Sequence, residues 1–403
     1  MGKKVMIVAG EASGDLHGAN LVKALRHLSP DLEIVGIGGE KMKAAGVEIL
    51  FDISQMAIVG FTEVLSQFKK LRRIFLKTCR VIKTEELAAL ILIDYPGFNL
   101  RLAAHVKKHK LEIPVIYYIS PQVWAWGKGR VKRIAELVDK MIVVFPFERE
   151  IYRNEGLPVE FVGHPLLDVI GERESEEKTA TDLNVSLDNP IVGLLPGSRR
   201  QEINRLLPLM LKAAKLMRKE MPTLRFILPR ASTVSSPEIG NLLPPDLEVS
   251  VVTDKTYKVM ALADLLLVAS GTATLEAACV GTPMIIVYKV SLLNWLLAKS
   301  LIKIPHLGLV NVVAGRKVVP EFLQFEAEPR RLASAALSLL EDRDKQELMK
   351  KDLKAVKAQL GRPGASRRAA HLVLEMTEDR ERKTAEDRRQ RTEDREQKTE
   401  DRR

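Results

Sequence analysis

The chain has 403 residues, 46% of them hydrophobic, and carries a formal net charge of +11 at pH 7. This length favours two domains with sizeable cores, and the positive charge favours anionic partners such as nucleotides or an anionic membrane surface. A disulfide framework and a thiolate zinc site are not expected, because the two cysteines lie outside any CxxC pattern. A membrane span is not expected, because no run of about 20 uncharged apolar residues occurs. The N-terminal segment also lacks the pattern of a signal peptide.

Apolar strand-like runs alternate with amphipathic helical segments along the chain. The first series of predicted strands comprises KVMIVAG (4–10), LEIVGIGG (32–39), AALILIDYPG (88–97), VIYYIS (115–120), KMIVVFPF (140–147) and VEFVG (159–163). A second series comprises PIVGLLPG (190–197), LRFILPRA (224–231), LEVSVVTD (247–254), DLLLVASG (264–271) and PMIIVYK (283–289). Continuous apolar runs are typical of parallel strands buried on both faces, and repeated strand–helix–strand units imply doubly wound sheets. The predicted fold class is therefore α/β, with two Rossmann-like doubly wound domains and a cleft between them.

Changes in composition set the predicted domain boundaries. Residues 1–170 are predicted as an N-terminal Rossmann-like domain and residues 191–345 as a C-terminal one, joined by the polar, charged linker 171–190. Residues 377–403 repeat a Thr-Glu-Asp-Arg theme and contain almost nothing apolar. This tail is expected to be disordered or to form a solvated, charge-paired helix.

The turns that follow strands are informative, because an open parallel sheet binds its ligand beyond the carboxyl ends of its strands. In LLPGSRRQEI (194–203), Gly197 and Ser198 allow close backbone approach, and the guanidinium groups of Arg199 and Arg200 suit a phosphate. The turn in ASGTATLEAACVGTP (269–283) offers amides and hydroxyls for a diphosphate and a carboxylate for a ribose, from Ser270, Gly271, Thr272, Ala273, Thr274 and Glu276. The plainer alternatives are solvated arginines at an ordinary turn and a threonine that only caps the helix.

Carboxylates follow two strands of the first domain. Asp94 ends a fully apolar strand in LILIDYPGFN (90–99), where a raised pKa would let it accept a proton, although capping of the next helix explains it equally well. Glu11 and Asp15, in GEASGD (10–15), would face the same cleft, and an acidic mouth suits a sugar better than a phosphate. These three carboxylates are the catalytic candidates, and the pattern does not decide which is the base.

The motifs of common cofactors are missing. No GxGxxG follows the first strand, no Walker A motif occurs, and the DxD at 342–344 lies in a polar helical region. No cofactor and no metal are therefore predicted. Nucleic acid is not predicted as a partner, because no nucleic-acid-binding module is recognisable.

Two segments combine apolar and basic residues. MAIVGFTEVLSQFKKLRRIFLK (56–77) contains Phe61, Phe68 and Phe75, and SLLNWLLAKSLIKI (291–304) contains Trp295. Helices of this kind lie in a membrane interface or contact acyl chains, so the four aromatic residues are predicted to face lipid. An ordinary core-facing helix with a basic outer face is the alternative for each segment.

The motifs follow one another in the order found in one family. GEASGD, GIGG (36–39), DYPGFN (94–99), SPQVWAWGKGR (120–130), FVGHPLLD (161–168), LLPGSRRQEI, SGTATLEAA (270–278) and PHLGLVNVVAGRKVVPEFLQ (305–324) resemble those of the lipid-A-disaccharide synthases. The resemblance extends from about residue 4 to about residue 375 and implies a GT-B glycosyltransferase whose C-terminal helix, 346–376, crosses back to the first domain. It also implies that Asn311 and Gln324 belong to the UDP-binding residues and that Asp94 is the first candidate for the base.

The family implies an inverting transfer in lipid A and lipopolysaccharide biosynthesis. UDP-2,3-diacylglucosamine and 2,3-diacylglucosamine 1-phosphate (lipid X) would give the β-1,6-linked lipid A disaccharide 1-phosphate and UDP, with no metal. The resemblance also implies a peripheral protein at the cytoplasmic face of the inner membrane of a Gram-negative-type bacterium. The oligomeric state stays open, a homodimer included. A GT-B enzyme similar to UDP-N-acetylglucosamine 2-epimerase is the alternative, because it would share the GHP and GTATLE-like turns.

Overall fold

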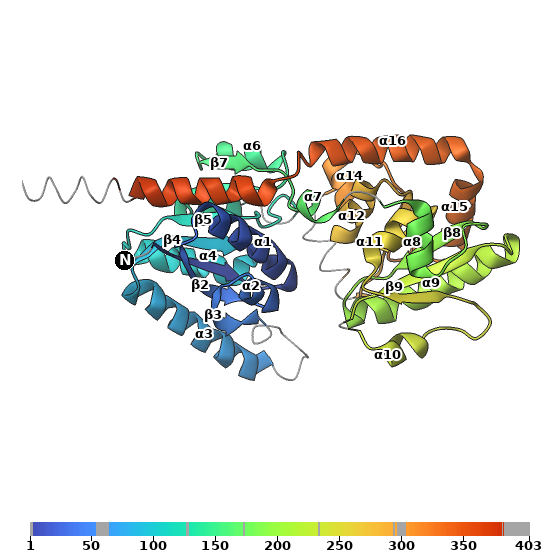
Figure 1. The fold of residues 1–403 in the computed structure, drawn as a ribbon, viewed down its shortest axis with the longest axis horizontal. Coiled ribbons are helices and arrows are strands. Elements are labelled where there is room, and N and C mark those ends of the chain that lie inside the picture. The colour runs from blue at the N-terminus through green and yellow to red at the C-terminus, as the bar shows by residue number, and fades with distance from the viewer. Residues whose placement is uncertain are drawn as a thin grey trace, which may run out of the picture. The chain divides into compact units, whose positions relative to one another are not determined.

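The computed structural model describes residues 3–53, 64–125, 129–171, 174–232, 234–292, 295, 304–380 and 382, without the side chains of 64–68. The chain forms two compact units, one comprising Met1–Pro165 with Arg362–Arg403 and the other Leu166–Gly361. Each unit has one parallel sheet with helices between its strands (Figure 1). The expected pair of Rossmann-like doubly wound units is confirmed.

The first unit contains a seven-stranded sheet of order β3-β2-β1-β4-β5-β6-β7. Its strands are β1 (Lys4–Ala9), β2 (Glu33–Gly38), β3 (Glu48–Asp52), β4 (Leu87–Ile93), β5 (Val115–Tyr118), β6 (Lys140–Val143) and β7 (Val159–Phe161). Its helices are α1 (Ala12–Leu28), α2 (Glu40–Ala44), α3 (Val64–Thr84), α4 (Pro96–Lys108), α5 (Arg130–Leu137), α6 (Glu148–Arg153) and a helix over 365–380. Every residue of β4 is buried, which is why this central strand has a continuous apolar sequence.

The second unit contains a six-stranded sheet of order β10-β9-β8-β11-β12-β13. Its strands are β8 (Ile191–Leu195), β9 (Arg225–Arg230), β10 (Ser250–Thr253), β11 (Leu265–Ala269), β12 (Met284–Tyr288) and β13 (Glu321–Leu323). Its helices are α7 (Leu166–Val169), α8 (Glu176–Leu183), α9 (Arg200–Glu220), α10 (Ser236–Gly240), α11 (Thr256–Leu262), α12 (Thr272–Val280), α14 (Leu309–Ala314), α15 (Pro329–Glu341) and α16 (Arg343–Gln359). The carboxyl ends of these parallel strands meet at one edge, where a ligand is expected.

The segment 171–190, expected to be a linker, contains helix α8. Ser175 caps this helix by accepting a hydrogen bond from the backbone N–H of Lys178 at 3.3 Å. Ala180 and Leu183 are buried and the charged residues lie outside. A helix this short has too narrow an apolar stripe to be recognised from its periodicity. The boundary between the two units accordingly lies at Pro165, five residues before the expected position.

The range 346–376, expected to be one helix, is divided. Helix α16 belongs to the second unit and ends at Gln359, and the helix over 365–380 belongs to the first unit. Gly361 and Gly364 have φ values of +90° and +95°, a backbone conformation that ends a right-handed helix. Arg380 then donates to the backbone carbonyl of Leu87 at the start of β4. The second helix is thereby attached to the sheet of the first unit (Figure 1).

The predicted lipid-facing residues have different outcomes. Phe75 points inward, because its ring contacts those of Phe98 and His105, with centroids 5.7 and 6.5 Å away. Trp295 is half-buried. Phe61 and the side chain of Phe68 lie outside the described residues.

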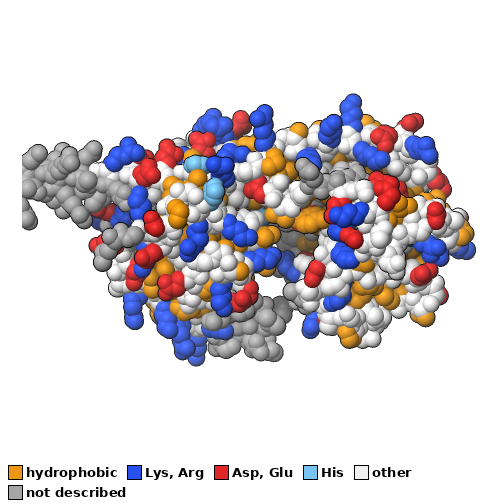
Figure 2. All heavy atoms as spheres, viewed as in Figure 1, with side chains coloured by type: hydrophobic (Ala, Val, Ile, Leu, Met, Phe, Trp, Pro, Cys, Tyr) orange, Lys and Arg blue, Asp and Glu red, His pale blue; other side chains and the backbone are white. Residues whose placement is uncertain are grey.

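The outer face of α3 is strongly basic. Lys69, Lys70, Arg72 and Arg73 are exposed, and Leu76 exposes 56% of its surface beside them. Blue side chains accordingly gather over α3 in Figure 2. Within the described part of the chain, no helix is both long enough and apolar enough to cross a membrane.

Candidate active site

The turn after β4 holds Asp94 in an uncommon backbone conformation. Asp94 and Tyr95 have φ values of +44° and +46°, and each left-handed non-glycine residue costs about 1–3 kcal/mol. Buried side chains hold the turn, since the carbonyl oxygen of Asp94 accepts hydrogen bonds from Asn99 Nδ2 at 2.7 Å and from the Tyr117 hydroxyl at 2.5 Å. The strain therefore persists at one of the two strand ends where a carboxylate was predicted to act.

Burial and, to a smaller extent, the negative charge of Glu11 together raise the pKa of the Asp94 carboxyl to about 6, against a hydrogen bond from the Tyr95 backbone that lowers it. Glu11 follows β1, the strand beside β4. Gly10 permits this approach, because a Cβ at Gly10 would lie 2.2 Å from the Tyr95 ring. The structure thus brings Glu11 and Asp94 together, and a carboxyl with this pKa can accept a proton near neutral pH.

Asp15 contacts the start of helix α2. Its buried carboxylate accepts hydrogen bonds from the backbone N–H groups of Gly39, Lys41 and Met42 at 2.7, 3.1 and 3.0 Å. These groups lie at the start of α2, where N–H donors have no partner within the helix. Both carboxylate oxygens of Asp15 therefore hold the start of α2.

A pocket in the second unit gathers most of the residues predicted to bind a nucleotide. It encloses about 380 Å³ at the carboxyl edge of the sheet. It is lined by Leu195, Gly197, Ser198, Arg199, Glu202, Pro229, Ala231, Thr256, Ala269, Ser270, Gly271, Thr272, Ala273 and Glu276. The two turns picked out in the sequence, after β8 and β11, thus form one site. Glu202 and Thr256 were not predicted.

The amino end of α12 opens on this pocket. Gly271 precedes the helix with φ +153° and ψ −159°, a region essentially restricted to glycine. The first N–H groups of a helix lack partners within it, and the helix dipole there favours an anion by about 0.3–1 kcal/mol. The end of α12 therefore suits the phosphate groups of a nucleotide.

Glu276 lies on α12 within the same pocket and has a partner that the sequence did not reveal. The Tyr257 hydroxyl of α11 donates a hydrogen bond to Glu276 Oε1 at 3.2 Å. Burial raises the pKa of the Glu276 carboxyl, and this hydrogen bond lowers it. One oxygen of Glu276 is thus oriented by Tyr257, which leaves the carboxylate placed to accept hydrogen bonds from ribose hydroxyls.

The two neighbouring arginines of the pocket turn differ in their surroundings. Arg199 lines the pocket, and its Nη1 lies 3.5 Å from Glu202 Oε1. The Nη2 of Arg200 instead lies 2.6 Å from Glu238 Oε1 at α10, and Arg200 does not line the pocket. Only Arg199 is therefore a candidate for direct contact with a phosphate.

Comparison with known proteins decides the family. A sequence model described as lipid-A-disaccharide synthetase matches residues 5–376. The chain belongs to the lipid-A-disaccharide synthase family. It is 48% identical over 375 residues to the lipid-A-disaccharide synthase of Geobacter metallireducens, covering 93% of this chain and 97% of that protein. It is 46% identical to that of Trichlorobacter lovleyi, covering 93% and 98%. The chain is accordingly a glycosyltransferase.

Solved structures similar to this member of the lipid-A-disaccharide synthase family support its GT-B fold. A UDP-GlcNAc 2-epimerase from Neisseria meningitidis, solved with UDP-GlcNAc, aligns with a TM-score of 0.62 over 92% of this chain and 100% of that one, at 14% identity. The glycosyltransferase of kitacinnamycin aligns with a TM-score of 0.59 over 94% and 100%, also at 14% identity. At this identity the similarity shows the fold alone.

Three residues predicted for UDP binding in this member of the family do not line the pocket. The Thr274 hydroxyl donates to the carbonyl of Gly271 at 2.8 Å. Asn311 Nδ2 donates to Glu321 Oε1 at 2.6 Å inside the unit. The Gln324 amide bonds both the N–H and the carbonyl of Val290, at 3.0 and 3.1 Å. All three side chains are buried and shape the segments around the pocket.

A buried carboxyl group of the first unit also escaped the sequence analysis. Glu148 accepts hydrogen bonds from the Trp124 indole N–H at 3.1 Å and the Phe145 backbone N–H at 3.3 Å. Burial raises its pKa to about 8, against these hydrogen bonds. The indole and the rings of Phe145, Phe147 and His164 form a chain of contacts around it. Glu148 thus anchors the turn after β5, and its raised pKa favours the protonated form.

Proposed function

We propose that this chain transfers the 2,3-diacylglucosamine unit of UDP-2,3-diacylglucosamine to the 6-hydroxyl of 2,3-diacylglucosamine 1-phosphate. The products would be the β-1,6-linked disaccharide 1-phosphate and UDP. The observation that carries the proposal is the family match over residues 5–376. The two clusters of polar residues at strand ends supply groups for such a reaction.

The UDP part of the donor would occupy the pocket of the second unit. Arg199 and the amino end of α12 suit the diphosphate, and Glu276, oriented by Tyr257, suits the ribose. As the bond between the anomeric carbon and the phosphate oxygen breaks, UDP leaves with the electron pair. Positive groups at the pocket stabilise that developing charge, so the leaving group needs no proton and the proposal requires no metal.

The acceptor sugar would bind at the Asp94 turn of the first unit. The oxygen of its 6-hydroxyl attacks the anomeric carbon from the side opposite UDP, which inverts the configuration, and its proton passes to the Asp94 carboxylate. The raised pKa of this carboxyl, which results from burial and from Glu11, supports its assignment as the base. We assign to Glu11 two roles, raising the pKa of Asp94 and contacting the acceptor sugar. We assign Asp15 to holding α2.

The substrates carry acyl chains, so the enzyme is proposed to work at the cytoplasmic face of the inner membrane. The exposed lysines and arginines of α3, with Leu76 among them, support contact with an anionic lipid surface. The oligomeric state of the enzyme, a homodimer included, is left open by this proposal.

The test combines both substrates with the purified protein in detergent, with EDTA present, and detects products by mass spectrometry. The expected product is the tetra-acylated disaccharide monophosphate, together with UDP. The alternative activity, 2-epimerisation of UDP-N-acetylglucosamine, is assayed in parallel. Epimerised sugar without any disaccharide would contradict the proposal. Disaccharide formed without EDTA but not in its presence would contradict the metal-free step.

A further inference from the structure

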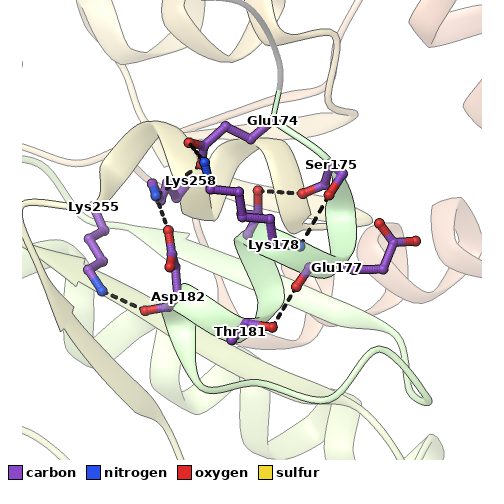
Figure 3. Close-up of polar contacts among 9 residues, drawn as sticks. Glu174, Ser175, Glu177, Lys178, Thr181, Asp182, Lys255 and Lys258 are labelled. Atoms are coloured by element: carbon purple, nitrogen blue, oxygen red, sulfur yellow. Dashed lines mark hydrogen bonds and ion pairs between the residues drawn. The ribbon is translucent and has the colours of Figure 1, made fainter.

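Helix α8 is attached to α11 by a cluster of ion pairs (Figure 3). Lys258 of α11 bonds Glu174, just before α8, at 3.0 Å, and it also bonds the carboxylate of Asp182 near the end of α8. Lys255 donates to the backbone carbonyl of Asp182 at 2.5 Å. Two lysines one turn apart thus hold both ends of α8.

The two residues between these lysines border the nucleotide pocket. Thr256 lines the pocket, and Tyr257 donates its hydrogen bond to Glu276. In the four consecutive residues 255–258, the first and the last therefore bond α8, and the middle two border the pocket. A shift of α11 would change the position of the Tyr257 hydroxyl, because both contacts depend on the same helical turn.

The ion pairs of Lys258 are only partly exposed and share their partners. The side chains of Lys258, Glu174 and Asp182 expose only 34%, 36% and 38% of their surface. Lys258 is shared by two carboxylates, and Lys178 bonds the other oxygen of Glu174 at 2.9 Å. The bond to Asp182 raises the pKa of Lys258, in keeping with a favourable pair. A network of this kind restrains two helices more than an isolated pair does.

We propose that Lys258 is a positioning residue for nucleotide binding, because it fastens α11 to α8 and so holds Thr256 and Tyr257 at the pocket. The proposal rests on the proposed function, in which this pocket takes UDP. It also gives a role to α8, which lies in the stretch expected to be a plain linker.

The first experiment measures the dissociation constant of UDP by calorimetry for the wild type and for Lys258→Met. The methionine keeps an unbranched side chain and removes the charge. We expect affinity to fall about two- to fivefold, as for loss of a modest ion-pair network, and Lys258→Arg to restore it. Raising the salt concentration should narrow the difference between wild type and Lys258→Met, because salt screens the pairs.

The matched control is Lys215→Met. Lys215 Nζ lies 2.5 Å from Asp246 Oδ1 in the same unit, and neither residue lines the pocket. This variant should bind UDP as the wild type does. Equal UDP affinities for wild type, Lys258→Met and Lys215→Met would overturn the proposal and leave the proposed function intact. A wild type that does not bind UDP would overturn both.

A double-mutant cycle separates positioning from general loosening of the fold. If Lys258 acts through Tyr257, Lys258→Met should weaken UDP binding little further in a Tyr257→Phe background. Independent, fully additive effects would contradict the route through Tyr257. If Lys258→Met does not fold, as judged by circular dichroism, the same cycle is made with Asp182→Asn, which removes a partner of Lys258.

Discussion

The hydroxyl of Tyr117 donates a hydrogen bond of 2.5 Å to the backbone carbonyl of Asp94. Tyr117 is fully buried on β5, the strand beside β4, so the base candidate is held in place from the interior of the sheet. Replacement by phenylalanine removes one hydrogen bond and leaves the ring in place. The turn at Asp94 then loses one of the two side chains that hold its carbonyl.

We therefore expect Tyr117→Phe to lower kcat by at least about tenfold through misplacement of the carboxylate, and to lower the free energy of unfolding by about 1 kcal/mol. The control is Tyr152→Phe, which removes a similarly buried hydrogen bond, of 2.6 Å, to Ser120. Urea unfolding and steady-state kinetics on both variants make the comparison. Equal losses of kcat would mean that stability alone accounts for the effect.

Asp94→Asn should abolish most of the activity and spare nucleotide binding. Loss of a general base typically costs about 10²–10⁴-fold in kcat. The UDP dissociation constant should not change, since the nucleotide pocket lies wholly in the other unit. Glu40→Gln, an exposed change on α2, serves as the control. Retention of more than about a tenth of wild-type kcat in Asp94→Asn would move the base elsewhere, Glu11 being next.

The pH dependence of kcat should report the environment of Asp94. The carboxyl must be ionised to accept a proton, and its pKa is raised to about 6, so activity should fall as the pH is lowered through about 6. The charge of Glu11 contributes to that raised pKa. Glu11→Gln should therefore move the acidic limb of the profile to lower pH. An unmoved limb would mean that the two carboxyl groups are not coupled during catalysis.

Arg199 and Arg200 provide an internally matched pair for the nucleotide pocket. Arg199→Ala should weaken UDP binding about tenfold or more, because a hydrogen bond to a charged group contributes about 1.5–3 kcal/mol. Arg200→Ala should change the affinity less than about twofold, since Arg200 is paired with Glu238 as an exposed ion pair. Calorimetric titration with UDP distinguishes the two. The reverse ranking would contradict the assignment of Arg199.

Glu148 should make stability depend on pH. Its pKa is raised from 4.5 to about 8 by burial, so the folded state binds more protons than the unfolded state between these values. The free energy of unfolding should therefore be highest below about pH 4.5 on this account and fall as the pH rises through about 8. Glu148→Gln should reduce this decrease of the free energy of unfolding with pH. Glu150→Gln, an exposed change on the same helix, should keep it.

Urea unfolding at pH 5 and pH 8 gives the free energy of unfolding of the wild type, Glu148→Gln and Glu150→Gln, and the difference between the two pH values is compared. If this difference is unchanged in Glu148→Gln, the buried carboxyl group is not its source. The amide oxygen of the glutamine still accepts from the Trp124 indole, whereas its NH2 cannot accept from the Phe145 backbone N–H. The proton is therefore tested by the change of unfolding free energy with pH and not by the absolute stability of the variant.

The central strands and the turns that follow them were predictable because they depend on local pattern. Strand β4 is apolar at every position and buried at every position. Two of the four edge strands, β3 and β13, were not predicted, because their sequences EILFD and EFL contain only short apolar runs. The same logic applies to α8, whose few buried residues are hidden among charged ones.

The candidate site divides in the same way. Asp94, Gly271 and Glu276 were found because strand ends meet at one edge of a parallel sheet, which follows from the topology alone. The bond from Tyr257 to Glu276 and the use of Asp15 by α2 join residues far apart in the chain. No spacing in the sequence encodes such pairs.

By itself, then, the sequence determined the fold class and the family and picked out the candidate turns, because apolar periodicity and short motifs are patterns of neighbouring residues. Only the tertiary structure showed that Asp94 is buried near Glu11 and that Asp15 supports a helix. It also decided that Phe75 packs inward and that the final helical segment is divided between two units. These outcomes depend on burial and on partners brought together by folding, and a side chain's pKa and role change with both.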